Sequence, residues 1–411
     1  MIIAIDIRHL TTPRTSGVGH YTIRLIEEMA KTSPEDVFIL FAAGRRRTLA
    51  HLPEFDAPNI RVTTSHIPNR FLFALLRLPF GPTLENFLKV KPDVWFFPNL
   101  NITRTKLPYI LTVHDLSFKL FPKFYTFKDR VWYKVARTER FINEATHLLA
   151  VSNSTKYDLV ELLKVDPNKI LVTHLGVDNE YSHGELPSDK NYLHKHKIDY
   201  PYLLTLSTLE PRKNIETAIE AYSAWRAKLG SSTFQGEVRR GFGQTSIPHL
   251  IIAGGKGWRT HGINEVLKHS KFKDDIHLIG YVIDKHKPAL YRHAKAFLFP
   301  SFYEGFGLPV LEAMACGTPV ITSFTGSMPE VVGDAAIMID PFDVSDLELA
   351  LEQLSCRRGR SCTCPNEVES KWQPQGLPLR EKLIARGLKR ASRFRWEQTA
   401  QLTLDAIHQI K

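Results

Sequence analysis

The sequence predicts an α/β protein built from two doubly wound parallel sheets that face one cleft. Short β-branched runs alternate with amphipathic stretches through most of the 411 residues, and strands that alternate with helices imply parallel pairing. The length exceeds the roughly 150 residues of an ordinary domain and therefore favours two domains. A polar segment with little periodicity ends at Asp199 and separates two such series. We expect one sheet on each side of it.

Apolar runs of three to six residues mark the strands of both series. In the first series the predicted strands are 2–7, 37–42, 62–64, 94–97, 109–113 and 148–151, with a helix at 21–30. In the second series they are 202–206, 250–253, 276–278, 296–299, 320–322 and 337–339. Two polar segments, 231–244 and 355–376, are predicted to be exposed loops. Apolar spacing in 396–410 predicts a last helix.

Composition narrows the class of protein. The chain has 54 Lys and Arg against 43 Asp and Glu, a net charge of +11, which favours anionic partners without selecting one. Its start, 1–6, enters a strand without a basic leader, and no apolar stretch approaches the ~20 residues that span a bilayer. Cys356, Cys362 and Cys364 lack the spacing of a zinc site. We expect a cytoplasmic protein, soluble or attached to a membrane surface, with no metal.

One turn in the second half carries the clearest chemical signal. The apolar run 297–299 stops at Pro300 as a buried strand would, and Pro309 suits a first helical turn because its missing N–H is not needed there. Gly305 and Gly307 fall between them, where a backbone without Cβ can take unusual dihedrals and let a ligand approach. The following helix start directs partial positive charge at the same place. The turn predicts an anion site, most simply for a diphosphate.

Two acids, Glu304 and Glu312, bracket this turn. A carboxylate accepts hydrogen bonds from paired hydroxyls. Carboxylates on both sides of a bound diphosphate would suit a nucleotide sugar, which carries a ribose at one end and a hexose at the other. Glu312 alone would also be consistent with a solvated glutamate on a helix face.

Other polar residues follow predicted strands at the end where open α/β sheets bind ligands. Arg212 and Lys213 follow strand 202–206 and bring two adjacent cations suited to a diphosphate. His114 follows strand 109–113, where a loop histidine with a purely structural hydrogen bond is the alternative. Gly17 and Gly19 lie between the first strand and its helix, but Thr22 replaces the third glycine of a dinucleotide fingerprint.

Segment 299–330 resembles family 4 of the retaining glycosyltransferases. The resemblance rests on the two acids of Glu304–Glu312, the run 315–321 and the turn Gly326–Glu330, and it extends more weakly over almost all of the chain. It implies the GT-B fold with two Rossmann-like domains. By resemblance, residues 1–180 form an acceptor-binding domain, 181–200 a linker, 201–395 a nucleotide-sugar domain and 396–411 a helix that returns to the first domain.

The resemblance also implies roles for the candidate residues. His114 and Glu304 are placed at the transferred sugar as the catalytic pair, and Glu312 at the ribose. The implied donor-binding set is Gly17, Gly19, Arg212, Lys213, Glu304, Gly305, Phe306, Gly307, Leu308 and Glu312. The chain has no Asp-x-Asp pair, and neither a metal nor a cofactor is expected.

The predicted function is a retaining, metal-independent hexosyltransferase of polysaccharide or glycan biosynthesis. Mannose from GDP-mannose is the favoured donor, and a saccharide or lipid-linked saccharide the acceptor. A catalytically silent subunit that binds a sugar nucleotide or a membrane is one alternative, and a sugar-nucleotide epimerase or phosphorylase is another. Release of free nucleotide from labelled donors would separate the first alternative from the enzyme.

The stretch 119–140 interleaves basic and aromatic residues, and Arg130, Lys134 and Arg137 share a helical face. A solvated basic face over an aromatic core explains it most simply. Peripheral contact with an anionic membrane or a phosphate-bearing acceptor comes next. No recognition motif for nucleic acid accompanies the stretch, so no nucleic-acid partner is expected.

Overall fold

The computed structural model describes residues 1–78, 80–229, 247–355 and 378–410. The chain folds into two compact units, Met1–Gly176 with Phe394–Lys411 (unit 1) and Val177–Arg393 (unit 2). The predicted loop 231–244 and all of 355–376 except Ser355, with its three cysteines, lie outside the described residues.

Unit 1 contains a seven-stranded parallel sheet in the order β3-β2-β1-β4-β5-β6-β7. Its strands are β1 Ile2–Asp6, β2 Val37–Ala43, β3 Ile60–Ser65, β4 Val94–Phe97, β5 Tyr109–Val113, β6 His147–Ala150 and β7 Ile170–Val172. The central strands β4 and β5 are buried along their whole length, as expected where helices cover both faces of a parallel sheet. The sequence prediction omits β7.

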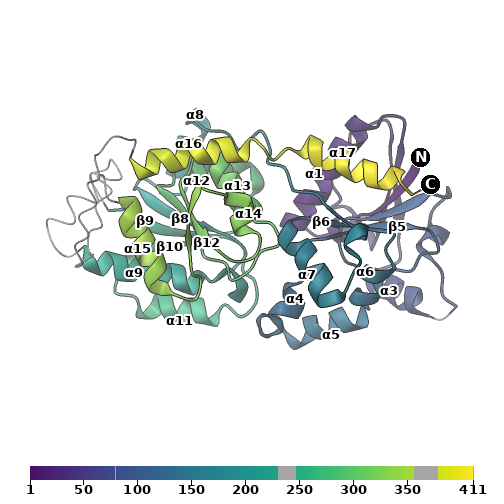
Figure 1. The fold of residues 1–411 in the computed structure, drawn as a ribbon, viewed down its shortest axis with the longest axis horizontal. Helices are drawn as coiled ribbons and strands as arrows, with labels where there is room; N and C mark the ends of the chain where they lie inside the picture. Colours follow the sequence, from purple (N-terminus) through teal and green to yellow (C-terminus); the bar gives the residue numbers. More distant parts are fainter. Residues whose placement is uncertain (79, 230–246, 356–377, 411) are drawn as a thin grey trace. The chain divides into compact units, whose positions relative to one another are not determined.

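The helices of unit 1 include the end of the chain. They are α1 Gly17–Thr32, α2 Arg46–Leu49, α3 Asn69–Arg77, α4 Ser117–Leu120, α5 Phe127–Val135, α6 Thr138–Glu144, α7 Asn153–Leu163 and α17 Trp396–His408. Figure 1 shows α17 lying along α1. The ring of Trp396 packs near Tyr21 of α1, and the Thr399 hydroxyl donates to the carbonyl of His174 at 2.6 Å. The last helix therefore belongs to the first unit.

Unit 2 contains a six-stranded parallel sheet in the order β10-β9-β8-β11-β12-β13. Its strands are β8 Tyr202–Leu206, β9 His249–Ala253, β10 Ile276–Gly280, β11 Ala296–Phe299, β12 Val320–Ser323 and β13 Ala336–Ile339. Its helices are α8 Pro187–Lys195, α9 Ile215–Lys228, α11 His261–His269, α12 Lys287–His293, α13 Leu308–Ala315, α14 Met328–Val332, α15 Val344–Ser355 and α16 Leu379–Ala391. Figure 1 shows α16 beside α13, in agreement with their contacts.

The linker expected at 181–200 is wrong, because this segment is part of unit 2. It contains α8, which packs on α12. Buried Asp189 of α8 accepts two hydrogen bonds of 2.7 Å from Arg292 of α12. Helix α8 was not predicted because the segment 181–200 has many charged side chains and little apolar periodicity. The residue that pairs with Asp189, Arg292, lies about a hundred positions further along the chain.

The strand order confirms the predicted pair of doubly wound Rossmann-like sheets. In each sheet the order reverses next to the first strand, between β1 and β4 in unit 1 and between β8 and β11 in unit 2. Open α/β sheets bind ligands at the carboxyl ends of the strands beside such a reversal. In the part of the chain that the structure describes, no helix is long and apolar enough to cross a bilayer.

Candidate donor-binding site

The predicted cations and acid of unit 2 meet at the reversal between β8 and β11. Glu304 follows β11, while Arg212 and Lys213 lie in a short 3-10 turn after β8. The Lys213 ammonium lies 2.6 Å from one carboxylate oxygen of Glu304, and the Arg212 guanidinium lies 2.9 Å from the other. Arg212 also pairs with Glu210 and donates to the carbonyl of Tyr303 at 2.7 Å. Residues about ninety positions apart thus form one nearly buried charge cluster.

The charge cluster fixes the ionisation of Glu304. Burial by itself raises the pKa of this carboxyl, but the charges of Arg212 and Lys213 outweigh burial and lower the pKa to about 2. Glu304 is therefore a carboxylate at neutral pH. It can accept hydrogen bonds but cannot donate a proton, which suits a group that holds sugar hydroxyls.

This lowered pKa predicts a pH-dependent contribution of Glu304 to stability. The folded-state pKa of about 2 lies below the ordinary 4.5, so the contribution is complete above pH 4.5 and is lost as the pH falls towards 2. Its size is about 3 kcal/mol. We expect the free energy of unfolding of wild type minus that of Glu304→Gln, measured by denaturant titration, to be constant above roughly pH 5 and to shrink steadily in acid. If this difference in the free energy of unfolding stayed the same in acid, the pairing of Glu304 with Arg212 and Lys213 would be contradicted.

A second turn holds the loop that carries Glu304. The hydroxyl oxygen of buried Ser327 lies 3.0 Å from the carbonyl oxygen of Glu304 and 2.9 Å from that of Phe306, so the two carbonyls share its one proton. Gly326 has φ +59°, and a Cβ there would lie 2.7 Å from the Glu304 carbonyl oxygen. The Gly326–Glu330 turn noted in the sequence thus packs against the backbone of the loop that carries Glu304 and holds it in place.

Replacing Gly326 with alanine is expected to lower the free energy of unfolding by roughly 2–4 kcal/mol, because left-handed strain adds to a backbone clash. Thermal unfolding would measure this loss. Gly280→Ala is the matched control, since Gly280 has φ +75° with nothing near its missing Cβ. If both variants lost the same free energy of unfolding, the close approach of the new Cβ to the Glu304 carbonyl would not be destabilising.

The glycine turn predicted between the two acids differs in detail. Gly307 has φ +97° and precedes α13, so it takes the left-handed conformation expected of a glycine. Gly305 is not among the left-handed glycines of the described chain. Phe306 is buried and Leu308 is the first residue of α13. The amide end of α13 and the cations Arg212 and Lys213 belong to the same unit, and both favour an anion.

Glu312 lies inside the unit. It is 4% exposed, and one of its carboxylate oxygens accepts a hydrogen bond of 2.9 Å from the Tyr291 hydroxyl. Burial, followed by the charge of Glu312, raises the pKa of Tyr291 and of Tyr181 far above the usual range, so both phenols stay protonated donors. The solvated glutamate considered from sequence is therefore wrong. The role of Glu312 at a ribose stays a prediction.

His114 follows β5 in unit 1, as predicted. Its Nε2 lies 2.8 Å from the carbonyl of Pro98, and the ring of Tyr21 packs edge-on at 4.9 Å. Burial lowers the pKa of His114, so the imidazole is neutral at pH 7. A neutral ring that donates through Nε2 presents Nδ1 as an acceptor.

Gly17 and Gly19 do not form a loop ahead of the helix. Helix α1 begins at Gly17, earlier than the predicted start near Tyr21, because the Ser16 hydroxyl caps it by accepting from the Gly19 amide at 3.1 Å. A Cβ at Gly17 would meet nothing within 4 Å, so this position faces open space. Both glycines therefore lie in the first turn of a helix.

Sequence reasoning missed a buried charged pair at the carboxyl end of β1. Arg8 binds both carboxylate oxygens of Asp6, at 2.8 and 2.7 Å. Burial, opposed only in part by the charge of Asp6, lowers the pKa of neighbouring His9 to about 4. The signal was available, since Asp6 ends β1, the strand beside the reversal in sheet order, and Arg8 and His9 follow it directly.

Comparisons with known proteins agree with this fold. A family model described as "Glycosyl transferases group 1" matches residues 189–360, and one described as "Glycosyltransferase Family 4" matches residues 15–181. The chain is 28% identical over 402 residues to O-antigen chain mannosyltransferase B of Escherichia coli, covering 95% of both chains. It is 28% identical over 295 residues to the serotype-specific mannosyltransferase WbdA of Escherichia coli, covering 69% of this chain and 31% of that protein. Sucrose-phosphate synthase of Thermosynechococcus elongatus superimposes with a TM-score of 0.71 at 17% identity, over 100% of this chain and 98% of that one.

The two Rossmann-like units and these matches define a glycosyltransferase of the GT-B fold. The two family models together span most of the chain. This protein belongs to the group 1 glycosyltransferases of the family 4 type, as its acidic turn indicated.

Proposed function

We propose that this glycosyltransferase moves mannose from GDP-mannose to a saccharide or lipid-linked saccharide during assembly of a surface polysaccharide such as O-antigen. The similarity to an O-antigen chain mannosyltransferase along 95% of both chains supports the sugar and the polymer. The structural observation that carries the proposal is the pairing of Glu304 with Arg212 and Lys213 at the sheet reversal of unit 2. There the cations would face a diphosphate and the carboxylate a sugar.

In the proposed reaction the C1–O bond to the diphosphate breaks and a C1–O bond to the acceptor hydroxyl forms on the same face of the sugar. The acceptor's proton passes to the departing phosphate oxygen. The anomeric configuration is retained because the new bond forms on the face that the diphosphate leaves. Arg212, Lys213 and the amide end of α13 would stabilise the negative charge that grows on the diphosphate. Because these groups supply the positive charge, the proposal requires neither a metal nor a cofactor.

The remaining residues would position the donor. Glu304 would accept hydrogen bonds from sugar hydroxyls, and Glu312 from the ribose. His114, neutral and with Nδ1 as acceptor, would take a hydrogen bond from a hydroxyl of the transferred sugar. Gly17 would contribute its exposed helix-start position and Gly19 its small size to the approach of the phosphates.

A product assay tests this function. The purified protein is incubated with GDP-mannose, UDP-glucose or UDP-galactose, with and without a saccharide acceptor, and nucleotide and sugar products are resolved by chromatography and NMR. We expect GDP and an α-mannosylated acceptor, formed from GDP-mannose only when acceptor is present. Epimerised donor, a sugar phosphate, or no turnover of any donor would each contradict the proposal.

We also propose peripheral contact with the inner, anionic face of a membrane through α5. Phe127, Val131 and Val135 lie four residues apart on this helix and are all exposed, next to Arg130 and Lys134. An exposed apolar stripe beside basic side chains suits a bilayer of anionic lipids. The aromatic cluster expected beneath this stretch is present, since Tyr133 stacks on Phe118 at 4.1 Å and packs edge-on against Tyr125 and Trp132, and the exposed apolar stripe of α5 is an additional feature.

Phe127→Ser is expected to weaken binding to phosphatidylglycerol vesicles at least tenfold, since a phenylalanine side chain contributes about 2 kcal/mol when removed from water. Vesicle sedimentation measures the change. Tyr157→Ser, which removes an exposed aromatic from α7 of the same unit, should leave binding unchanged. Equal loss in both variants would exclude α5 as the contact.

A further inference from the structure

A polar cavity lies in unit 1, and the proposed transfer reaction does not use it. Its volume is about 490 Å³, within the range of ligand pockets. We call it the basic pocket, and its polar lining includes Arg77, Thr103, Arg104, Lys106, Arg137 and Arg140, together with Glu144. The pocket reaches Tyr109 at the amino end of β5, whereas His114 follows the carboxyl end of that strand, roughly 15 Å away.

Positive charge dominates the basic pocket. Five cations line it and Glu144 is the one acid among its lining residues. Arg140 pairs with Glu144 at 2.7 Å, which leaves an excess of four positive charges. Arg77 and Arg104 donate to the backbone carbonyls of Val135 and Leu78, which orient the two side chains. Such an excess favours a multiply charged anion.

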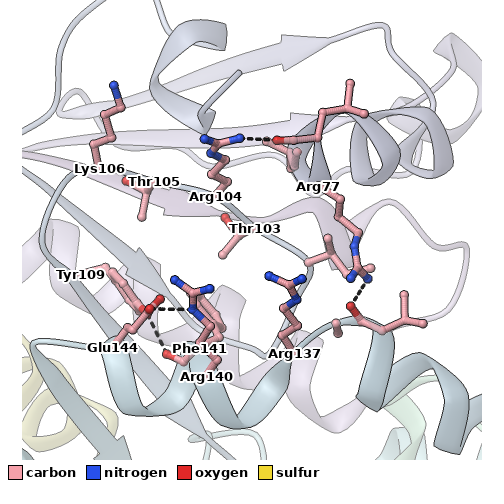
Figure 2. Close-up of a pocket in the computed structure, with 15 residues that line it drawn as sticks. Arg77, Thr103, Arg104, Thr105, Lys106, Tyr109, Arg137, Arg140, Phe141 and Glu144 are labelled. Carbon is pink, nitrogen blue, oxygen red and sulfur yellow. Dashed lines mark hydrogen bonds and ion pairs between the residues drawn. The ribbon is translucent and has the colours of Figure 1, made fainter. Parts of the chain in front are cut away.

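The donors of the basic pocket come from opposite walls. Figure 2 shows Thr103 and Arg104 on one side and Arg137 and Arg140, at the start of α6, on the other. The Thr103 hydroxyl is buried and has no hydrogen-bond partner among the described residues. A buried hydroxyl without a partner costs free energy unless a ligand or water satisfies it. A phosphate oxygen between the two walls would accept from Thr103 and from the guanidinium groups.

The rest of the wall is apolar. Leu76, Leu78 and Val135 line the same cavity, and Leu78 and Val135 are exposed. Phe80, next along the described chain after Leu78, is also fully exposed. A free inorganic anion would gain nothing from this apolar rim, whereas a phosphate that carries a hydrocarbon chain would cover it.

We propose that the basic pocket binds the diphosphate group of a lipid-linked acceptor, with the lipid chain leaving over the apolar rim. The identity of the acceptor rests on the proposed transfer function, but binding of the diphosphate does not. Arg137, Arg140 and Thr103 hold the phosphate oxygens, and Arg77 and Arg104 supply the surrounding charge. The pocket thereby selects acceptors that carry a diphosphate.

Vesicle binding without any donor tests the proposal. Wild type is titrated with vesicles that contain a polyprenyl diphosphate and with phosphatidylglycerol vesicles of equal total charge, and with inorganic pyrophosphate in solution. We expect at least tenfold tighter binding to the diphosphate vesicles than to the charge-matched ones, and weaker but measurable binding of pyrophosphate. The double variant Arg137→Gln/Arg140→Gln should lose this tenfold preference, and Thr103→Val should reduce it.

The matched control is Arg46→Gln/Arg61→Gln, which removes two exposed cations from α2 and β3 of the same unit and should keep the full preference. Melting temperatures identify any variant that fails to fold, in which case Thr103→Val alone decides. Equal binding to both vesicle types, or an equal loss in pocket and control variants, would overturn the proposal in favour of non-specific charge attraction. Glu304→Gln should bind the diphosphate vesicles as wild type does, so a failed transfer assay and a failed pocket remain distinguishable.

Discussion

Glu304→Gln should lower kcat at least a hundredfold, about 2.7 kcal/mol in the activation barrier. The amide keeps the size of the side chain but replaces a hydrogen-bond acceptor with a donor at one position, so it cannot hold two sugar hydroxyls. It also leaves Arg212 and Lys213, which now share this carboxylate at 2.9 and 2.6 Å, without their common counter-ion. Steady-state kinetics with GDP-mannose and acceptor measure the effect.

Glu304→Gln also removes a buried ion pair, so its effect on stability must be separated from its effect on turnover by a control variant. Asp189→Asn removes another buried carboxylate from unit 2, one that binds Arg292 through both oxygens away from the charge cluster. This variant should lose a comparable free energy of unfolding and keep wild-type turnover per folded molecule. If both variants lost activity in proportion to stability, Glu304 would have only a structural role.

Lys213→Met should lower kcat about a hundredfold while changing the KM for the donor much less. The lysine charge is most valuable when the diphosphate departs, and removing one such group from an active site typically costs a factor of 10²–10³. Lys213 is held in place by Glu304 and by the face of the Phe299 ring, 5.1 Å from its ammonium. Its charge is therefore already positioned before the donor binds.

Lys228→Met is the matched control for this prediction. Lys228 lies on α9 and pairs with Glu348 and Glu352, outside the charge cluster. Its removal should leave both kinetic constants unchanged. A Lys213→Met enzyme with normal kcat and a raised KM would show that the lysine only binds the donor in the ground state.

Much of the fold could be predicted because it depends on local patterns. The buried strands β5 and β8 have the predicted bounds to within a residue, since uninterrupted apolar runs rarely fit anything else. Segments stabilised by distant partners were not predictable in this way. Helix α8 depends on Arg292, and β7 is only three residues long and lies at the edge of its sheet.

In the candidate site, too, features that depend on local sequence could be predicted and features that depend on distant residues could not. Glu304, Arg212 and Lys213 could be chosen from the sequence because each follows a strand beside the sheet reversal. Their mutual pairing, the support from Ser327 and the hydrogen bond from Tyr291 to Glu312 could not, because each joins residues distant in sequence. The early start of α1 was missed because two glycines in a first helical turn oppose the usual propensities.

The structure of the protein bound to GDP-mannose tests the central claim most directly. We expect the diphosphate within hydrogen-bonding distance of Arg212 and Lys213, at the amide end of α13, with mannose hydroxyls donating to the carboxylate of Glu304. A donor bound elsewhere, with Glu304 still enclosed by its two cations and no sugar in contact with it, would contradict the assignment.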